Sequence, residues 1–190
     1  MKKKDRKNII LESLAGMLEE RNMSKVTTAL LAEKSGITEA ALYRHFPSKR
    51  SIYAELFAFC DNAIFSKCNE LKKENISSKE KIKNAFIFFM IFVEKNKGFA
   101  RLLSREALSS NEQNVSDNVN QFYERYELFI RQLLKEDANN LVTQPGISAQ
   151  LIVTSLEGNV SRYIRSKFKD SPSSYIENVW ELLSISIFKN

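Results

Sequence analysis

The sequence predicts an all-α protein in which a three-helix helix-turn-helix domain, residues 1–50, precedes a helical-bundle body, residues 51–190. Apolar residues recur at the helical spacing of three to four along most of the chain, and no convincing strand alternation is present. Single Gly, Pro, Ser and Thr residues separate the periodic segments. The 190 residues, 43% of them hydrophobic, are enough for one domain or two small ones, and we expect about nine helices.

The first helix is indicated by Ile10, Leu14, Met17 and Leu18, which share one helical face. We expect this helix to end around Arg21.

The next two helices are short, and each has recognisable start and stop residues. Thr27 or Thr28 can cap a helix of about two turns, and Gly36 can adopt the left-handed conformation that ends it. Thr38 can cap the third helix, which Pro47 stops. Two short helices joined by a turn with Gly are typical of a helix-turn-helix, whose second helix enters the major groove of DNA.

The rest of the chain predicts the helical body. The expected elements are a helix from Ser48 to about Lys72, helices at 79–95 and 99–108, a polar stretch at 109–116, a helix around 119–133, a loop at 137–146, and helices at 148–168 and 174–188. The run AFIFFMIFV, residues 85–93, is apolar on every side, as in a helix at the centre of a bundle. It is about half of the roughly 18 residues of a membrane span, so we expect no transmembrane helix.

Cysteine, histidine and glycine usage argues against several kinds of chemistry. Cys60 and Cys68 lie eight residues apart on a predicted helix, hence about 12 Å apart, too far for a disulfide. His45 is the only histidine and no cysteines are closely spaced, so neither a zinc site nor a Cys/His nucleophile is expected. The five glycines are scattered singly and form no phosphate-binding loop. We expect no metal, no cofactor and no enzymatic activity.

The charge distribution favours a polyanionic partner. The net charge is +6, and the excess is densest in residues 1–7, with five basic residues and one acidic residue. Such an arm suits DNA phosphates, because each neutralised phosphate releases counterions, although basic N-termini are also commonly solvated tails. No continuous apolar core of a secretory signal follows, so we expect a cytoplasmic protein.

The predicted recognition helix presents several polar groups outward, while Leu42 and Phe46 anchor it to the first helix. Threonine and alanine side chains can meet thymine methyl groups, and Tyr43 and His45 can donate to phosphates. The predicted DNA-binding residues are Lys7, Thr27, Thr28, Thr38, Glu39, Ala40, Tyr43, Arg44, His45 and Lys49. Short helix pairs also occur in ordinary bundles, and the spacing alone leaves both interpretations open.

The run from Ala32 through ALYRHFPSK resembles the signature of TetR-family regulators, in which a helix-turn-helix precedes a larger helical dimerisation body. Later segments, among them FVEKNKGFARLLSREAL and EGNVSRYIRSKFKDSP, are similar to the nucleoid-occlusion branch of that family. The resemblance implies a nucleoid-associated homodimer on pseudo-palindromic double-stranded DNA. On DNA it would bind the tubulin-like division GTPase FtsZ and antagonise Z-ring assembly over the chromosome.

The same resemblance implies a partner site on the fourth helix and the helix after it. Its positions here are Phe59, Lys67, Phe88, Lys95 and Asn96. Lys67 and Lys95 stand where the relatives have Arg, and Ile91 stands where they have Gly. Lysine keeps the charge but loses the fork that binds a carboxylate with two bonds, and isoleucine fills space that glycine leaves open. The alternative for Phe59 and Phe88 is ordinary core packing.

The last two predicted helices are candidates for a four-helix dimer interface, in which small residues allow close approach. The predicted interface residues are Ser155, Gly158, Val179, Trp180, Leu183 and Ile187. The alternative is packing within one protomer.

Two other functions remain open. The first is a TetR-type transcriptional repressor released by a small hydrophobic ligand, but residues 86–92 supply apolar walls without nearby polar partners, which favours a filled core. The second is a helical enzyme using Glu94, Glu106 or Glu157 as acid or base, but nothing in the sequence pairs these carboxylates.

Overall fold

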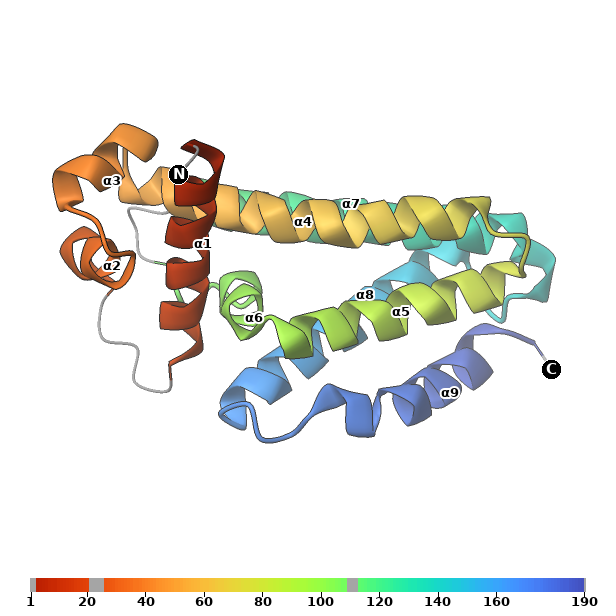
Figure 1. Cartoon of the computed structure of the whole chain (residues 1–190). Coiled ribbons are helices and arrows are strands. Elements are labelled where there is room, and N and C mark those ends of the chain that lie inside the picture. The colour runs from red at the N-terminus through yellow and green to blue at the C-terminus, as the bar shows by residue number, and fades with distance from the viewer. Residues whose placement is uncertain (1–2, 21–25, 109–112, 190) are drawn as a thin grey trace.

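The computed structural model describes residues 3–20, 26–108 and 113–189. These residues form nine α-helices, two single-turn 3₁₀ helices and one isolated β-bridge, which confirms the predicted all-α class (Figure 1). The α-helices are α1 (Lys3–Glu19), α2 (Thr28–Lys34), α3 (Glu39–His45), α4 (Lys49–Lys73), α5 (Ser78–Lys95), α6 (Lys97–Leu103), α7 (Gln113–Glu136), α8 (Pro145–Arg165) and α9 (Ile176–Ile187). The 3₁₀ helices are η2 (Ala138–Asn140) and η3 (Pro172–Ser174).

The caps of α2 and α3 are those that the sequence predicts. The Leu30 amide donates to Thr27 Oγ1 (3.2 Å), and the Ala41 amide donates to Thr38 Oγ1 (3.2 Å). Gly36 has a φ of +64°, the left-handed conformation that glycine adopts without strain. The predicted end of the first helix around Arg21 lies outside the described residues.

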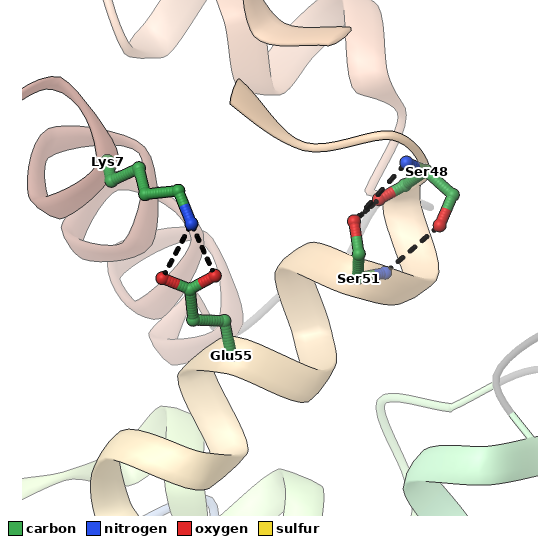
Figure 2. Close-up of polar contacts among 4 residues, drawn as sticks. All are labelled: Lys7, Ser48, Ser51 and Glu55. Carbon is green, nitrogen blue, oxygen red and sulfur yellow. Dashed lines mark hydrogen bonds and ion pairs between the residues drawn. The ribbon is translucent and has the colours of Figure 1, made fainter. Parts of the chain in front are cut away.

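The helix α4 connects the two parts of the molecule, running from beside α3 along the body (Figure 1). It begins with a reciprocal cap: the Ser51 amide donates to Ser48 Oγ, and the Ser48 amide donates to Ser51 Oγ, both at 3.2 Å (Figure 2). These bonds satisfy amides that the first helical turn leaves without backbone partners. The cap therefore sets the direction in which α4 leaves the helix-turn-helix.

Several body helices begin or end a few residues from the predicted positions. These are α6, which ends at Leu103, α7, which begins at Gln113, α8, which spans Pro145–Arg165, and α9, which begins at Ile176. Pro145 occupies the first turn of α8, where its missing amide costs no hydrogen bond. Just beyond the C-terminal end of α8, Lys167 and Phe168 have positive φ angles of 56° and 61°, which are not helical. The 3₁₀ turn η3 delays the start of α9.

The body core is filled by aromatic rings around α5. Phe86 and Phe89 are fully buried, and the ring of Phe86 lies 5.7 Å from that of Trp180. Phe89 and Phe99 each lie 5.9 Å from Phe122 between ring centres. The prediction that residues 86–92 form filled core is thus confirmed for this part of α5. None of the described helices is long and apolar enough to cross a bilayer.

Two glycine substitutions are expected to change stability in opposite directions. In Gly36→Ala the new methyl group meets open space, but the left-handed backbone costs about 1 kcal/mol. In Gly16→Ala the methyl group also meets open space, inside helix α1, and stability rises by about 0.5–1 kcal/mol. Urea unfolding at one protein concentration measures both. If both substitutions raised the free energy of unfolding, or both lowered it, the explanation from backbone conformation would be contradicted.

Candidate nucleic-acid interface

The helix-turn-helix is held together by a small set of buried side chains. Leu31 and Ala32 on α2 and Leu42 on α3 are 0–2% exposed, and Phe46 just after α3 is also buried. The small Ala32 side chain suits the point where two helices cross. This packing leaves the opposite side of α3 exposed.

The outward side of α3 carries the predicted DNA-binding residues. Glu39, Ala40, Tyr43 and Arg44 are all exposed, and Tyr43 exposes 47% of its surface. This exposure leaves the ring and hydroxyl of Tyr43 accessible to a binding partner. The structure therefore brings these four predicted residues to one face.

A hydrogen-bonded chain joins the exposed side chains of α2 and α3. The Thr28 hydroxyl donates to the Glu39 carboxylate, and the Tyr43 hydroxyl donates to Thr28 Oγ1 at 3.4 Å. The bond from Tyr43 is long and exposed, so a phosphate oxygen can replace Thr28 as its acceptor at little cost. The chain joins the Tyr43 side chain to α2 through Thr28.

Lys7 already has a partner within the protein. Its ammonium group donates to both carboxylate oxygens of Glu55 on α4, at 2.9 and 3.1 Å, and lies 4.8 Å from the centre of the Phe46 ring (Figure 2). A contact from Lys7 to a phosphate would have to compete with Glu55. The pair also connects α1 to α4 at the edge of the helix-turn-helix.

The remaining basic residues of the predicted set lie at the end of α3 and the start of α4. His45 is half-buried, and its Nδ1 is buried without a hydrogen-bond partner among the described residues, so that nitrogen cannot donate to a phosphate. The Lys49 ammonium lies 5.2 Å from the centre of the Tyr53 ring. The next residue, Arg50, is not in the predicted set but is exposed. Two adjacent basic residues, Lys49 and Arg50, at the end of the motif are the sequence feature from which Arg50 could have been predicted.

Two of the predicted partner-binding residues open onto a cavity of about 350 Å³ between α1, α4 and α6. Phe59, with 66% of its surface exposed, and Asn96 line this cavity together with Leu11, Leu56 and Phe99. Ordinary core packing is therefore wrong for Phe59.

The other predicted partner-binding residues lie outside the lining of the cavity. The Phe88 ring is half-buried, 6.0 Å from that of Phe92. The Lys67 ammonium pairs with Glu70 at 3.2 Å and Glu74 at 3.8 Å, while Lys95 is exposed.

The predicted dimer interface needs correction. Trp180 and Ile187 are wrong as interface residues, because both are buried inside the protomer with at most 2% exposed. Ser155, Val179 and Leu183 are partly buried and Gly158 is exposed.

A different set of apolar side chains faces outward from α8 and α9. Ile147 and Leu151 on α8 expose 55% and 44% of their surface, and Leu182 and Ile185 on α9 expose 69% and 65%. We call these four residues the α8–α9 apolar face. Their helical spacing was visible in the sequence, but α9 carries apolar residues on more than one side, and periodicity could not identify the outward one.

Two of the carboxylates considered for enzymatic catalysis have structural contacts. Glu106 lies 3.8 Å from Nε of the buried Arg101. Glu94 accepts hydrogen bonds from the Ser173 amide at 2.7 Å and from the hydroxyl groups of Ser171 and Ser173. Its role is to hold η3 against the end of α5. Among the described residues, no three acidic, Cys or His side chains are grouped to hold a metal ion.

This fold, with an exposed α3 face beside a helical body, defines a class of DNA-binding regulators, and two family models match the chain. Residues 10–56 match the bacterial regulatory proteins of the tetR family, and residues 77–187 match the SlmA-like form of the tetracyclin repressor-like C-terminal domain. The chain therefore belongs to the TetR family of bacterial regulatory proteins. More narrowly, its C-terminal body is of the SlmA-like type.

The similarity to curated relatives extends over nearly the whole chain. The nucleoid occlusion factor SlmA of Vibrio vulnificus is 37% identical, with 98% of this chain and 97% of the relative covered. The nucleoid occlusion factor SlmA of Marinobacter nauticus is 33% identical with the same coverage. The resemblance noted in the C-terminal segments is thus confirmed.

Solved structures of more distant proteins share the fold. The regulator NalD of Pseudomonas aeruginosa aligns with a TM-score of 0.81 at 14% identity, covering 98% of this chain and 99% of that one. FadR of Bacillus subtilis, solved with stearoyl-CoA, aligns with a TM-score of 0.78 at 17% identity, covering 95% of this chain and 98% of that one. At such identities only the architecture is shared.

Tyr43→Ala is expected to weaken specific DNA binding about tenfold or more, because it removes a hydrogen bond to a charged phosphate. The side chain is half exposed, so helix content and oligomer mass are expected to stay unchanged. Fluorescence anisotropy across a salt titration measures the affinity. Phe59→Ala, another exposed aromatic residue but on α4, serves as the control and is expected to bind DNA normally. Unaltered affinity of Tyr43→Ala at all salt concentrations would refute the assignment.

Proposed function

We propose that this protein is a sequence-specific DNA-binding nucleoid-occlusion factor. As a homodimer on pseudo-palindromic sites it binds FtsZ and antagonises Z-ring assembly over the chromosome, in a cytoplasmic, nucleoid-associated location. The observation that carries the proposal is similarity to nucleoid occlusion factors over 98% of the chain, including the body beyond the helix-turn-helix. A shared DNA-binding domain alone would support only a regulator of unspecified role.

DNA recognition is assigned to the outward face of α3. Thr38 and Ala40 offer methyl groups for thymine, and Glu39 can accept from a cytosine amino group. Tyr43 and Arg44 are exposed and reach toward the phosphate backbone in this proposal. Few groups read bases, so backbone contacts dominate the affinity and make it strongly dependent on salt.

Dimerisation is assigned to the α8–α9 apolar face. Four large apolar side chains exposed on the protomer surface are costly in water, and a two-fold axis that brings α8 and α9 against their copies would bury them. A dimer also presents two α3 helices to half-sites about 34–36 Å apart, which a single helix-turn-helix cannot do.

The FtsZ site is assigned to Phe59, Lys67, Phe88, Lys95 and Asn96. The exposed Phe59 ring beside the cavity between α1, α4 and α6 supports an apolar contact there, and the exposed Lys95 supports an attraction to acidic groups. Lys67 would have to exchange Glu70 and Glu74 for a partner carboxylate. The site adjoins α1, so a bound partner lies close to the DNA-binding helices.

A repressor released by a small hydrophobic ligand is the second candidate. The cavity of about 350 Å³ favours it, since this volume is within the range of small-molecule sites and α1 forms one wall. The aromatic segment of α5 does not favour a ligand site, because Phe86 and Phe89 are fully buried against other side chains.

Leu182→Arg is expected to raise the dimer dissociation constant by at least about a hundredfold, because two-fold symmetry places the unpaired charge in the interface twice. Leu182 is 69% exposed in the protomer, so helix content is expected to remain. Sedimentation velocity over a concentration series gives the mass. Phe59→Arg, with similar exposure on α4, is the matched control and should remain a dimer. A dimeric Leu182→Arg protein would exclude the α8–α9 apolar face as the interface.

A genome-wide binding map distinguishes the two candidate functions. Nucleoid occlusion predicts dozens of sites along the chromosome, mostly away from promoters and sparse near the replication terminus. One or two promoter sites, especially beside the protein's own gene, would instead establish a local repressor and overturn the main proposal.

A pelleting assay with purified FtsZ and GTP then tests the partner. With a duplex carrying a mapped site, the protein is expected to reduce the polymer fraction, and Phe59→Ala is expected to lose this effect while binding the duplex normally. Full polymer pelleting in the presence of the DNA-bound wild type would exclude FtsZ as the partner.

A further inference from the structure

A buried arginine links the DNA-binding domain to the body. Arg101 lies on α6 with 8% of its side chain exposed, and its Nη1 donates to the carbonyl oxygen of Glu20 at 2.8 Å. Glu20 follows the last residue of α1, where helix carbonyl groups have no backbone partners and the helix dipole favours a cation. Arg101 therefore binds the C-terminal end of α1.

One turn earlier on α6, Gly98 brings the two helices into close contact. A Cβ atom at this position would lie 3.1 Å from the Ala15 carbonyl oxygen and 3.3 Å from Leu18 Cβ. Only a glycine fits without displacing its neighbours by a few tenths of an ångström. The helix α6 of the body thus contacts α1 at two points, near Ala15 and at Glu20.

The other side of the Arg101 guanidinium faces α8. It lies 5.2 Å from the centre of the Phe168 ring, which in turn lies 5.0 Å from the Tyr163 ring. Tyr163 is on α8, and Phe168 is three residues beyond the end of this helix. The same side chain therefore contacts the end of α1, which belongs to the helix-turn-helix domain, and Phe168, which follows the helix α8 of the body.

The helices α2 and α3 pack on each other and on α1, so the position of α1 determines where the recognition helix lies (Figure 1). The second polar contact between α1 and the body, Lys7 to Glu55, is between side chains that are 36% and 43% exposed. Such exposed pairs contribute at most about 1 kcal/mol, and salt screens them. The buried Arg101 contact is the stronger constraint.

We propose that Arg101 is a positioning residue that fixes the helix-turn-helix relative to the dimer helices and thereby sets the half-site spacing that the dimer accepts. The inference rests on the proposed function as a dimeric DNA-binding protein. Pre-positioning of two recognition helices raises affinity for one spacing, since less conformational freedom is lost on binding.

The first test measures binding to duplexes whose half-site separation is changed by one base pair in each direction. Wild type is expected to prefer one spacing by at least about fivefold, and Arg101→Met is expected to lose most of this preference, mainly through weaker binding at the best spacing. Arg162→Met is the control. Arg101 has a carboxylate partner, Glu106 at 3.8 Å, and an aromatic one, Phe168 at 5.2 Å. Arg162 has the same two kinds of partner, Asp170 at 3.4 Å and Tyr175 at 5.4 Å, but its side chain is 58% exposed and both partners lie beside η3. Wild-type spacing preference in Arg101→Met would overturn the proposal.

The conservative variant Arg101→Lys separates positioning from mere structural support. Lysine keeps a cationic donor for the Glu20 carbonyl group but loses the planar contact with Phe168, so its spacing preference should lie between those of wild type and Arg101→Met. Circular dichroism and sedimentation establish that each variant folds and dimerises. A folded Arg101→Lys protein with no more preference than Arg101→Met would contradict a role for the Glu20 contact.

The second test uses DNA-free protein and is independent of DNA binding. Spin labels on Glu33→Cys, an exposed position on α2, report the distance between the helix-turn-helix domains of a dimer. Burial raises the pKa of the native Cys60 and Cys68 thiols to about 12, so at neutral pH almost none of these thiols is in the reactive thiolate form. A narrow distance distribution is expected in wild type, a broad one in Arg101→Met, and a shifted mean in Gly98→Ala.

The two tests fail in distinguishable ways. An unchanged narrow distribution in Arg101→Met overturns the positioning role, whatever the DNA results. A broadened distribution, in a protein whose wild type shows no specific binding to any mapped duplex, would keep the positioning role and reject the proposed function.

Discussion

The packing of α1 against α4 and α6 is the contact on which the rest of the structure depends. Ile10, Leu14 and Leu18 on α1 are fully buried and belong to the same hydrophobic cluster as the aromatic core of the body. A three-helix domain of this size buries little surface by itself, and the core that it shares with the body adds to this burial. The same packing decides how α3 is presented, because α2 and α3 rest on α1.

This arrangement also brings the predicted binding surfaces close to one another. The cavity beside Phe59 has α1 as one wall and α4 and α6 as the others, so a ligand or partner there contacts both parts of the molecule. Arg101 binds the C-terminal end of α1, next to Glu19, which also lines this cavity, and contacts Phe168 just beyond the end of α8. A shift of α1 would therefore change the cavity and the Arg101 contacts together, because packed helices move as units.

Much of the fold and part of the site could be predicted from local sequence. Thr27, Thr38 and Ser48 cap their helices as expected, because each cap needs only a side-chain oxygen a few residues from a free amide. The exposed face of α3 followed from Leu42 and Phe46, whose spacing defines the buried side. The C-terminal ends of α6 and α8 were misplaced, because these ends depend on backbone conformations at non-glycine residues that carry no compositional signal.

The sequence by itself determined the all-α class, the helix-turn-helix and its outward residues, because these depend on periodicity and on contacts between near neighbours in the chain. Only the tertiary structure decided which side of α9 faces outward: Trp180 packs on Phe86 of α5, which leaves Leu182 and Ile185 exposed. It also decided the partners of Lys7 and Arg101, which are Glu55 and the Glu20 carbonyl group, 48 and 81 residues away. Contacts at such separations are set by how whole helices pack, and no local pattern encodes them.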